Sequence, residues 1–175
     1  MSAAASPEHF MREALRVARA GLERGELPIG AVVVLDDRII AAAHTAERAE
    51  RRLLVHAELL ALDAADRLHP FPGRRRAVRL FTTLEPCLMC LGAAMSFGVG
   101  EIHYALESPG DGAVGLARGW RRDEAAMVSY RAPQLDGGLL RPESLDLFRD
   151  YVARHHSGGM WEWARGLIAG ADAVG

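Results

Sequence analysis

The stretch LVHAELL, residues 54–60, places a histidine and a glutamate two positions apart inside an otherwise apolar run. On an α-helix, residues i and i+2 point about 200° apart, so His56 and Glu58 cannot share one helix face and serve a site beside it. They can converge only on a site that lies off the N-terminal end of that helix. A single histidine in such a run is more often a hydrogen-bonded core residue than a metal ligand, so the HxE pattern needs partners elsewhere in the chain.

The chain contains two cysteines, Cys87 and Cys90, in the CxxC motif of TLEPCLMC at residues 83–90. A disulfide across so short a loop would stabilise the fold little, and a reducing compartment would not preserve it. The motif is then either a thioredoxin-like redox pair or half of a metal site. A redox pair and a metal half-site can both occur where a strand is followed by a helix. The presence or absence of further metal ligands elsewhere in the chain must therefore distinguish the two interpretations.

Length and composition indicate a single domain, because the chain has 175 residues and a hydrophobic fraction of 50%. The formal net charge is −2, and all 21 basic side chains are arginines. The N-terminal segment has no uninterrupted apolar core and contains Glu8, Glu13 and Glu23, which argues against a signal or transit peptide. No apolar stretch approaches the roughly 20 residues that span a bilayer. We therefore expect a cytoplasmic protein without a membrane segment.

Hydrophobic periodicity and turn residues predict a series of helices and strands. Ser6 and Pro7 suit the N-cap and first position of a helix that Gly25 would end, and Asp36 with Asp37 would close a hairpin. Residues 46–53 are predicted to form a charged loop. The predicted helices lie at about 7–24, 53–68, 87–98, 142–154 and 160–170, and the predicted strands at 29–35, 38–44, 76–83, 101–106 and 126–132.

These boundaries place His56 and Glu58 in the first turn of one helix, and Cys87 and Cys90 at positions i and i+3 at the start of another. One nitrogen and two sulfur ligands would leave the fourth tetrahedral position of zinc open, which is typical of a catalytic rather than a structural site. Both helix N-termini would favour thiolates there. Zinc can lower the pKa of bound water to about 7, and Glu58, not itself a ligand, could then transfer its proton.

Four segments together resemble a known family. HxE followed by PCxxC is the signature of zinc-dependent nucleobase deaminases, and this chain has HAE at residues 56–58 and PCLMC at 86–90. With their flanks, LPIGAVVV, VHAELLAL, TLEPCLMCLGA and GEIHYA resemble the cytidine and tRNA adenosine deaminase superfamily in order and spacing. The likeness runs from about residue 8 to 152 and is strongest to the tRNA adenosine deaminase and guanine deaminase branch.

The resemblance implies a three-layer α/β/α fold, with a central mixed sheet of about five strands flanked by helices, and usually a homodimer. Residues 1–154 would form the deaminase domain, and 155–175 a C-terminal extension packed on it. The resemblance also implies that zinc-bound hydroxide attacks an amine-bearing ring carbon and that ammonia leaves. It assigns the zinc ligands His56, Cys87 and Cys90, the proton shuttle Glu58, and substrate contacts at Ile29, Thr45, Ala57, Glu85 and Ser108.

Two of these substrate positions depart from the family. The tRNA and guanine deaminases carry an asparagine where this chain has Thr45, and the tRNA enzymes carry a ribose-contacting aspartate where this chain has Ser108. The tRNA enzymes also tend to end in a basic helix, whereas this chain ends MWEWARGLIAGADAVG. Arginines at 51–52, 74–76 and 118–122 could still contact phosphates, although solvated surface arginines are the commoner case.

We therefore predict a zinc-dependent hydrolytic deaminase of a free nucleobase or nucleoside, with no membrane partner. The alternative is a tRNA wobble-adenosine deaminase that makes inosine. A third possibility is a redox or binding module that uses CxxC alone and contains no zinc. In the extension, Trp161 and Trp163 would point to opposite sides of a helix, so that both pack on the core or one lines the pocket or a dimer contact. His155 and His156 are expected to be exposed to solvent.

Overall fold

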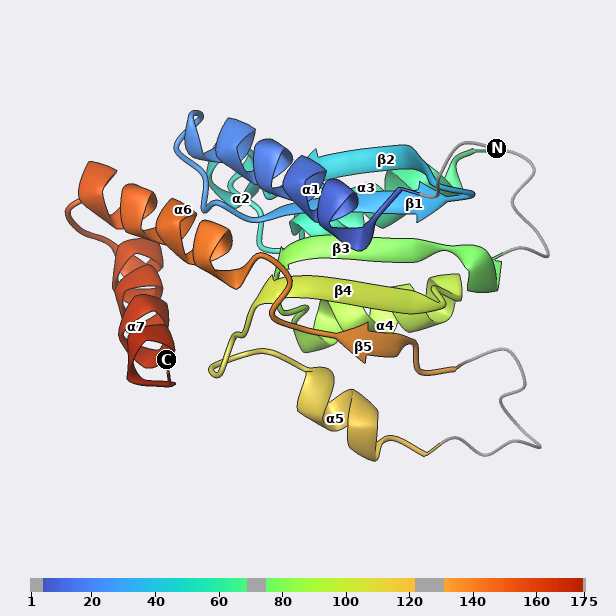
Figure 1. The fold of residues 1–175 in the computed structure, drawn as a ribbon. Helices are drawn as coiled ribbons and strands as arrows, with labels where there is room; N and C mark the ends of the chain where they lie inside the picture. The colour runs from blue at the N-terminus through green and yellow to red at the C-terminus, as the bar shows by residue number, and fades with distance from the viewer. Residues whose placement is uncertain (1–4, 69–74, 122–130, 175) are drawn as a thin grey trace.

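The computed structural model describes residues 5–68, 75–121 and 131–174, and its centre is a mixed sheet with helices on both faces (Figure 1). The strand order is β2-β1-β3-β4-β5. β1 pairs antiparallel with β2 and β3, whereas β3, β4 and β5 run parallel. The strands are β1 (Gly30–Leu35), β2 (Arg38–His44), β3 (Arg79–Leu84), β4 (Glu101–Leu106) and β5 (Gln134–Asp136). The predicted α/β fold with a mixed sheet is confirmed.

Alternating side chains along the strands create an apolar layer on each side of the sheet. Val32 and Val34 of β1 belong to one buried cluster, whereas Ala31 and Val33 belong to the other. The first cluster is covered by α1 (Pro7–Leu22), α6 (Arg141–Arg154) and α7 (Gly159–Val174). The second is covered by α3 (Ala57–Asp66), α4 (Leu88–Phe97) and α5 (Val114–Gly119).

The first helix and the hairpin form where the sequence predicts them. The Ser6 hydroxyl accepts the backbone N–H of His9 at 3.4 Å, and Pro7 occupies the first turn of α1. Asp36 and Asp37 adopt φ values of 51° and 56° between β1 and β2. Two successive left-handed residues are the geometry of a type I′ turn, whose twist matches that of the strands it joins.

The segment that precedes His56 differs from the prediction. Residues 46–53 contain a one-turn helix, α2 (Glu47–Glu50), where we expected a loop. The buried carboxylate of Glu26 accepts the N–H groups of Arg48 and Ala49 at 3.0 and 2.7 Å, a long-range cap that no local pattern reveals. Helix α3 begins at Ala57 rather than near residue 53, because the chain is extended at its N-cap, His56.

Other element boundaries also differ from the prediction. A 3₁₀ turn at Arg75–Ala77 delays the start of β3, and α5 forms in a glycine-rich segment for which no helix was predicted. Helix α7 is longer than the predicted helix, and Ala164, Leu167 and Ala171 anchor it in the first cluster. Most of the strand predicted at 126–132 lies outside the described residues. Among the described helices, none has the length and apolarity to cross a membrane.

Candidate active site

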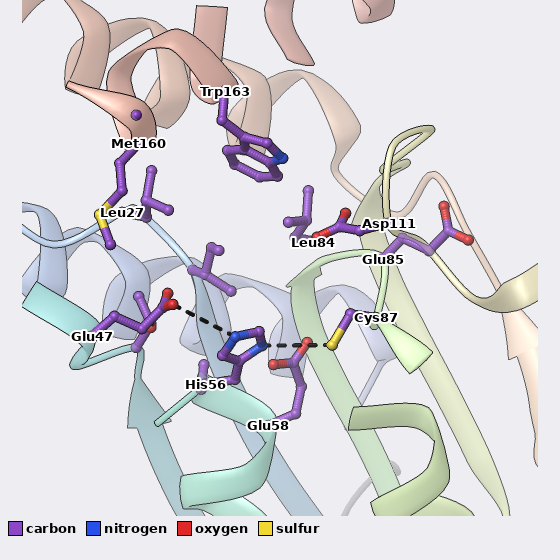
Figure 2. Close-up of a pocket in the computed structure, with 14 residues that line it drawn as sticks. Leu27, Glu47, His56, Glu58, Leu84, Glu85, Cys87, Asp111, Met160 and Trp163 are labelled. Carbon is purple, nitrogen blue, oxygen red and sulfur yellow. Dashed lines mark hydrogen bonds and ion pairs between the residues drawn. The ribbon is translucent and has the colours of Figure 1, made fainter. Parts of the chain in front are cut away.

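The starts of α3 and α4 bring the three predicted metal ligands together. His56 is the N-cap of α3 and Cys87 that of α4, and Cys90 lies in the first turn of α4. His56 Nδ1 lies 3.6 Å from Cys87 Sγ (Figure 2). It lies 3.5 Å from Cys90 Sγ. The three donor atoms all lie within 4.8 Å of one another, and both cysteines are free. One nitrogen and two sulfur donors fit zinc with a fourth position left open.

Without a metal, only one of the three candidate ligands, Cys87, has the protonation state of a zinc ligand, because hydrogen bonding to Cys87 raises the pKa of His56 to about 9. Hydrogen bonding from the Cys90 thiol, together with His56, lowers the pKa of Cys87 to about 4, so Cys87 is a thiolate at neutral pH. The same contact raises the pKa of Cys90 above its usual value. A bound divalent cation would reverse this second effect, because it stabilises the thiolate form of a cysteine ligand.

Glu58 lies beside the three ligands and is almost completely buried, with 3% of its surface exposed. Its Oε1 accepts the Thr82 hydroxyl at 3.0 Å, and its Oε2 accepts the Cys90 thiol at 3.4 Å. Burial, followed by the negative charge of Cys87, raises the pKa of this carboxyl above its usual range. A carboxyl that is held in place and has a raised pKa suits general acid–base chemistry at neutral pH.

One pocket of about 240 Å³ opens onto these groups. Four of the five predicted substrate positions line it, namely Ile29, Thr45, Ala57 and Glu85, but Ser108 does not. Sequence reasoning missed six residues of the pocket wall, namely Leu27, Glu47, Leu84, Asp111, Gly159 and Met160. It left open whether one of the two tryptophans of the extension lines the pocket, and Trp163 does.

Glu85 and Ser108 shape the loop after β4. The Glu85 carboxylate accepts the N–H groups of Ser108 and Val114, both at 3.0 Å, and a Cβ added to Gly112 would lie only 2.3 Å from Glu85 Cδ. The Ser108 hydroxyl donates to the carboxylate of Asp111. Buried Ser108 therefore holds Asp111, which lines the pocket in its place. In the sequence, the clue to Asp111 was that an acidic side chain lies three positions after Ser108, within reach of the same loop.

The C-terminal extension forms the opposite wall of the pocket. Met160 and Trp163 of α7 face the ligand cluster across the cavity (Figure 2). Trp161 lies outside the pocket, where its indole N–H donates to the Val152 carbonyl at 3.3 Å and its ring packs on Arg165. The two tryptophans thus have different surroundings.

His155 is half-buried rather than exposed, because its ring stacks on Tyr151 at 4.2 Å, whereas His156 is exposed as expected.

Comparison with known proteins gives the family. Residues 5–106 match the family model of the cytidine and deoxycytidylate deaminase zinc-binding region. The chain belongs to this deaminase family. The matched residues include His56, Glu58, Cys87 and Cys90 and end before the Asp111 loop and α7. The family resemblance is therefore confirmed, and the cofactor of this deaminase is zinc.

Relatives of this deaminase act on different substrates. A tRNA-specific adenosine deaminase of Bacillus subtilis (strain 168) is 36% identical over 138 residues, which cover 76% of this chain and 85% of that protein. A structure from a study of A-to-I editing by tRNA:A34 deaminases superposes with a TM-score of 0.65 and 34% identity, covering 79% of this chain and 98% of that one. The guanine deaminase from Nitrosomonas europaea superposes with a TM-score of 0.64 and 28% identity, covering 84% and 85% of the two chains.

Proposed function

We propose that this chain is a zinc-dependent hydrolytic deaminase of a small amino-purine or amino-pyrimidine, supplied as a free base or nucleoside. The reaction consumes water, replaces the ring amine by a carbonyl and releases ammonia. His56, Cys87 and Cys90 would hold zinc, which when bound makes water a nucleophile at neutral pH. The homodimer and the cytoplasmic location stay predictions.

Within this proposal, Glu58 moves the proton. Its carboxylate takes a proton from the attacking water and delivers it to the substrate, so that the amine departs as neutral ammonia. The Thr82 hydroxyl holds one carboxylate oxygen at 3.0 Å, which leaves the other turned toward Cys90 and the ligand cluster. Burial favours the protonated form of Glu58, as the second transfer requires.

The composition of the pocket wall favours a small substrate over RNA. Glu47, Glu58, Glu85 and Asp111 line the pocket, and no arginine of the described chain does. Carboxylates repel phosphate groups but accept hydrogen bonds from ring N–H, amine and sugar hydroxyl donors. A volume of about 240 Å³ lies below the roughly 300–1,000 Å³ of typical drug-sized ligand sites, so it suits a single base better than several nucleotides.

A tRNA adenosine deaminase is the second candidate, because the Bacillus subtilis relative at 36% identity has that activity. Its RNA contacts would have to come from arginines outside the pocket. Arg52 is paired with Glu50 at 2.7 Å, and the guanidinium of Arg76 donates to the Val99 carbonyl at 3.2 Å. Arg74 and Arg122 lie outside the described residues, and so does the side chain of Arg75.

A screen of free bases and nucleosides for ammonia release tests the proposal. We expect turnover of at least one amino-purine or amino-pyrimidine, with a KM that changes little between low and high salt, because a neutral substrate releases few counterions. Inosine formation in a tRNA anticodon stem-loop should be absent.

The contrary result is equally specific. Efficient deamination of the stem-loop, without turnover of any free base or nucleoside, would favour the tRNA enzyme. Affinity for that RNA should then fall steeply with salt, and alanine substitutions at residues 74–76 should flatten the slope by about one unit for each phosphate that is no longer neutralised.

The two tryptophans of α7 provide a matched pair of variants. Base–aromatic stacking contributes about 1–3 kcal/mol, so Trp163→Ala should raise KM for the preferred substrate about 5- to 150-fold. Trp161→Ala removes a ring of the same size from the same helix but outside the pocket, and should leave KM close to that of the wild type. Steady-state kinetics of both variants measures the difference. An equal rise in KM in both would mean that α7 only stabilises the fold.

A further inference from the structure

The two ring nitrogens of His56 face different partners. Nδ1 faces the sulfur atoms of Cys87 and Cys90 and is therefore the nitrogen placed to hold zinc. Nε2 faces the Oε1 atom of Glu47 at 3.7 Å (Figure 2). When Nδ1 binds a metal, the proton of the neutral ring resides on Nε2, which then becomes a hydrogen-bond donor directed at this carboxylate.

Glu47 is held in this position from two sides. It is the first residue of α2, whose N–H groups at Arg48 and Ala49 are fixed by the buried carboxylate of Glu26. The Thr45 hydroxyl lies 3.2 Å from Glu47 Oε2. One carboxylate oxygen of Glu47 is thus close to Thr45, and the other faces His56. The Glu47 side chain is only 15% exposed, so water competes weakly for it.

We propose that Glu47 is the positioning residue of the zinc-ligand histidine, and that Thr45 orients Glu47 in turn. A metal-bound histidine usually donates its second ring N–H to a carboxylate, carbonyl or water, which fixes the tautomer and the ring orientation and strengthens the ligand. The present 3.7 Å exceeds a direct hydrogen bond by less than 1 Å, so the proposal requires the two side chains to move closer together when the metal binds. The inference rests on the zinc ligands named under the proposed function.

This arrangement gives Thr45 a different role from the substrate contact expected at its position. Its buried hydroxyl lies near Glu47 Oε2 and, at 3.3 Å, near the Val55 carbonyl, so its hydrogen is directed to the protein. Val55 immediately precedes His56. Thr45 therefore contacts both the carboxylate that faces the histidine and the backbone that carries it.

The test is the zinc affinity of Glu47→Gln, measured by competition with a chromophoric chelator. Removal of such a carboxylate partner typically weakens metal binding 10- to 100-fold, and we expect a rise in the zinc Kd within that range. Glu50→Gln, on the same helix but exposed and paired with Arg52, is the matched control and should leave the Kd unchanged. Glu47→Asp keeps the charge and should recover part of the affinity.

Thr45→Val provides a second variant in case Glu47→Gln folds poorly. It removes the hydroxyl beside Glu47 while preserving side-chain shape, and should raise the zinc Kd by a smaller factor than Glu47→Gln. A Glu47→Gln protein with unchanged zinc Kd and a raised KM would overturn the inference, because Glu47 would then contact substrate directly. If His56→Ala kept the wild-type zinc affinity, the zinc ligands themselves would be wrong, which is a different failure from an unchanged Kd in Glu47→Gln alone.

Discussion

Replacing Glu58 by alanine is expected to lower kcat by about 10²- to 10⁴-fold, the usual contribution of a positioned general acid–base group, while the protein keeps its zinc. The physical reason is that Glu58 lies beside the three ligand side chains without being one of them. The effect should appear in kcat because proton transfer to and from the substrate fails. Ammonia release measures turnover, and metal analysis of the purified variant measures zinc content.

Two variants separate this effect from loss of the metal. Glu58→Gln keeps the shape of the side chain and its contact with the Thr82 hydroxyl but cannot carry a proton, so it should be nearly as inactive as Glu58→Ala. Cys87→Ala removes a ligand and should lose both zinc and activity. Substantial turnover by zinc-loaded Glu58→Ala would refute the assigned proton shuttle.

Removal of zinc is expected to lower the melting temperature reversibly. The ligands come from the starts of two helices, and residues 56 and 87 come together only in the folded chain, so zinc binds the native state preferentially. At a free zinc concentration about 1,000 times Kd this linkage stabilises the fold by about 4 kcal/mol. For a chain of this size, each kcal/mol corresponds to roughly 2–4 °C in Tm.

Thermal unfolding with and without a chelator measures this shift, and added zinc should restore the original Tm. Cys87→Ala is the control, because a protein that no longer binds the metal should show the same Tm with and without chelator. An unchanged Tm in the wild type, with metal removal verified by analysis, would mean that zinc does not link α3 to α4.

The parts of the structure that could be predicted are those specified by neighbours in the sequence. The Ser6–Pro7 cap, the Asp36–Asp37 turn and the helix start at the CxxC motif depend on local backbone preferences. His56 and Glu58 cannot share a helix face, and both lie at the N-terminal end of α3, where the sequence predicted their site. Most of the strand predicted at residues 126–132 lies outside the described residues, and its last two residues precede β5 without belonging to it. The predicted loop at 46–53 was wrong because Glu26 caps α2 from more than 20 positions away.

By itself the sequence determined the family, four strands of the sheet and the nitrogen and sulfur donors of the candidate metal site, because helix caps, hydrophobic periods and motif spacing are local properties of the chain. Only the tertiary structure decided which side chains line the pocket. Asp111 enters the pocket because Glu85 fixes the loop that carries it, and Trp163 enters because α7 packs on the first apolar cluster. Glu47 faces His56 because α2 is capped by Glu26. These positions depend on contacts between segments that are distant in the sequence. The geometry of such contacts is set by the packing of the whole chain, so it produces no repeating pattern of residues from which it could be predicted.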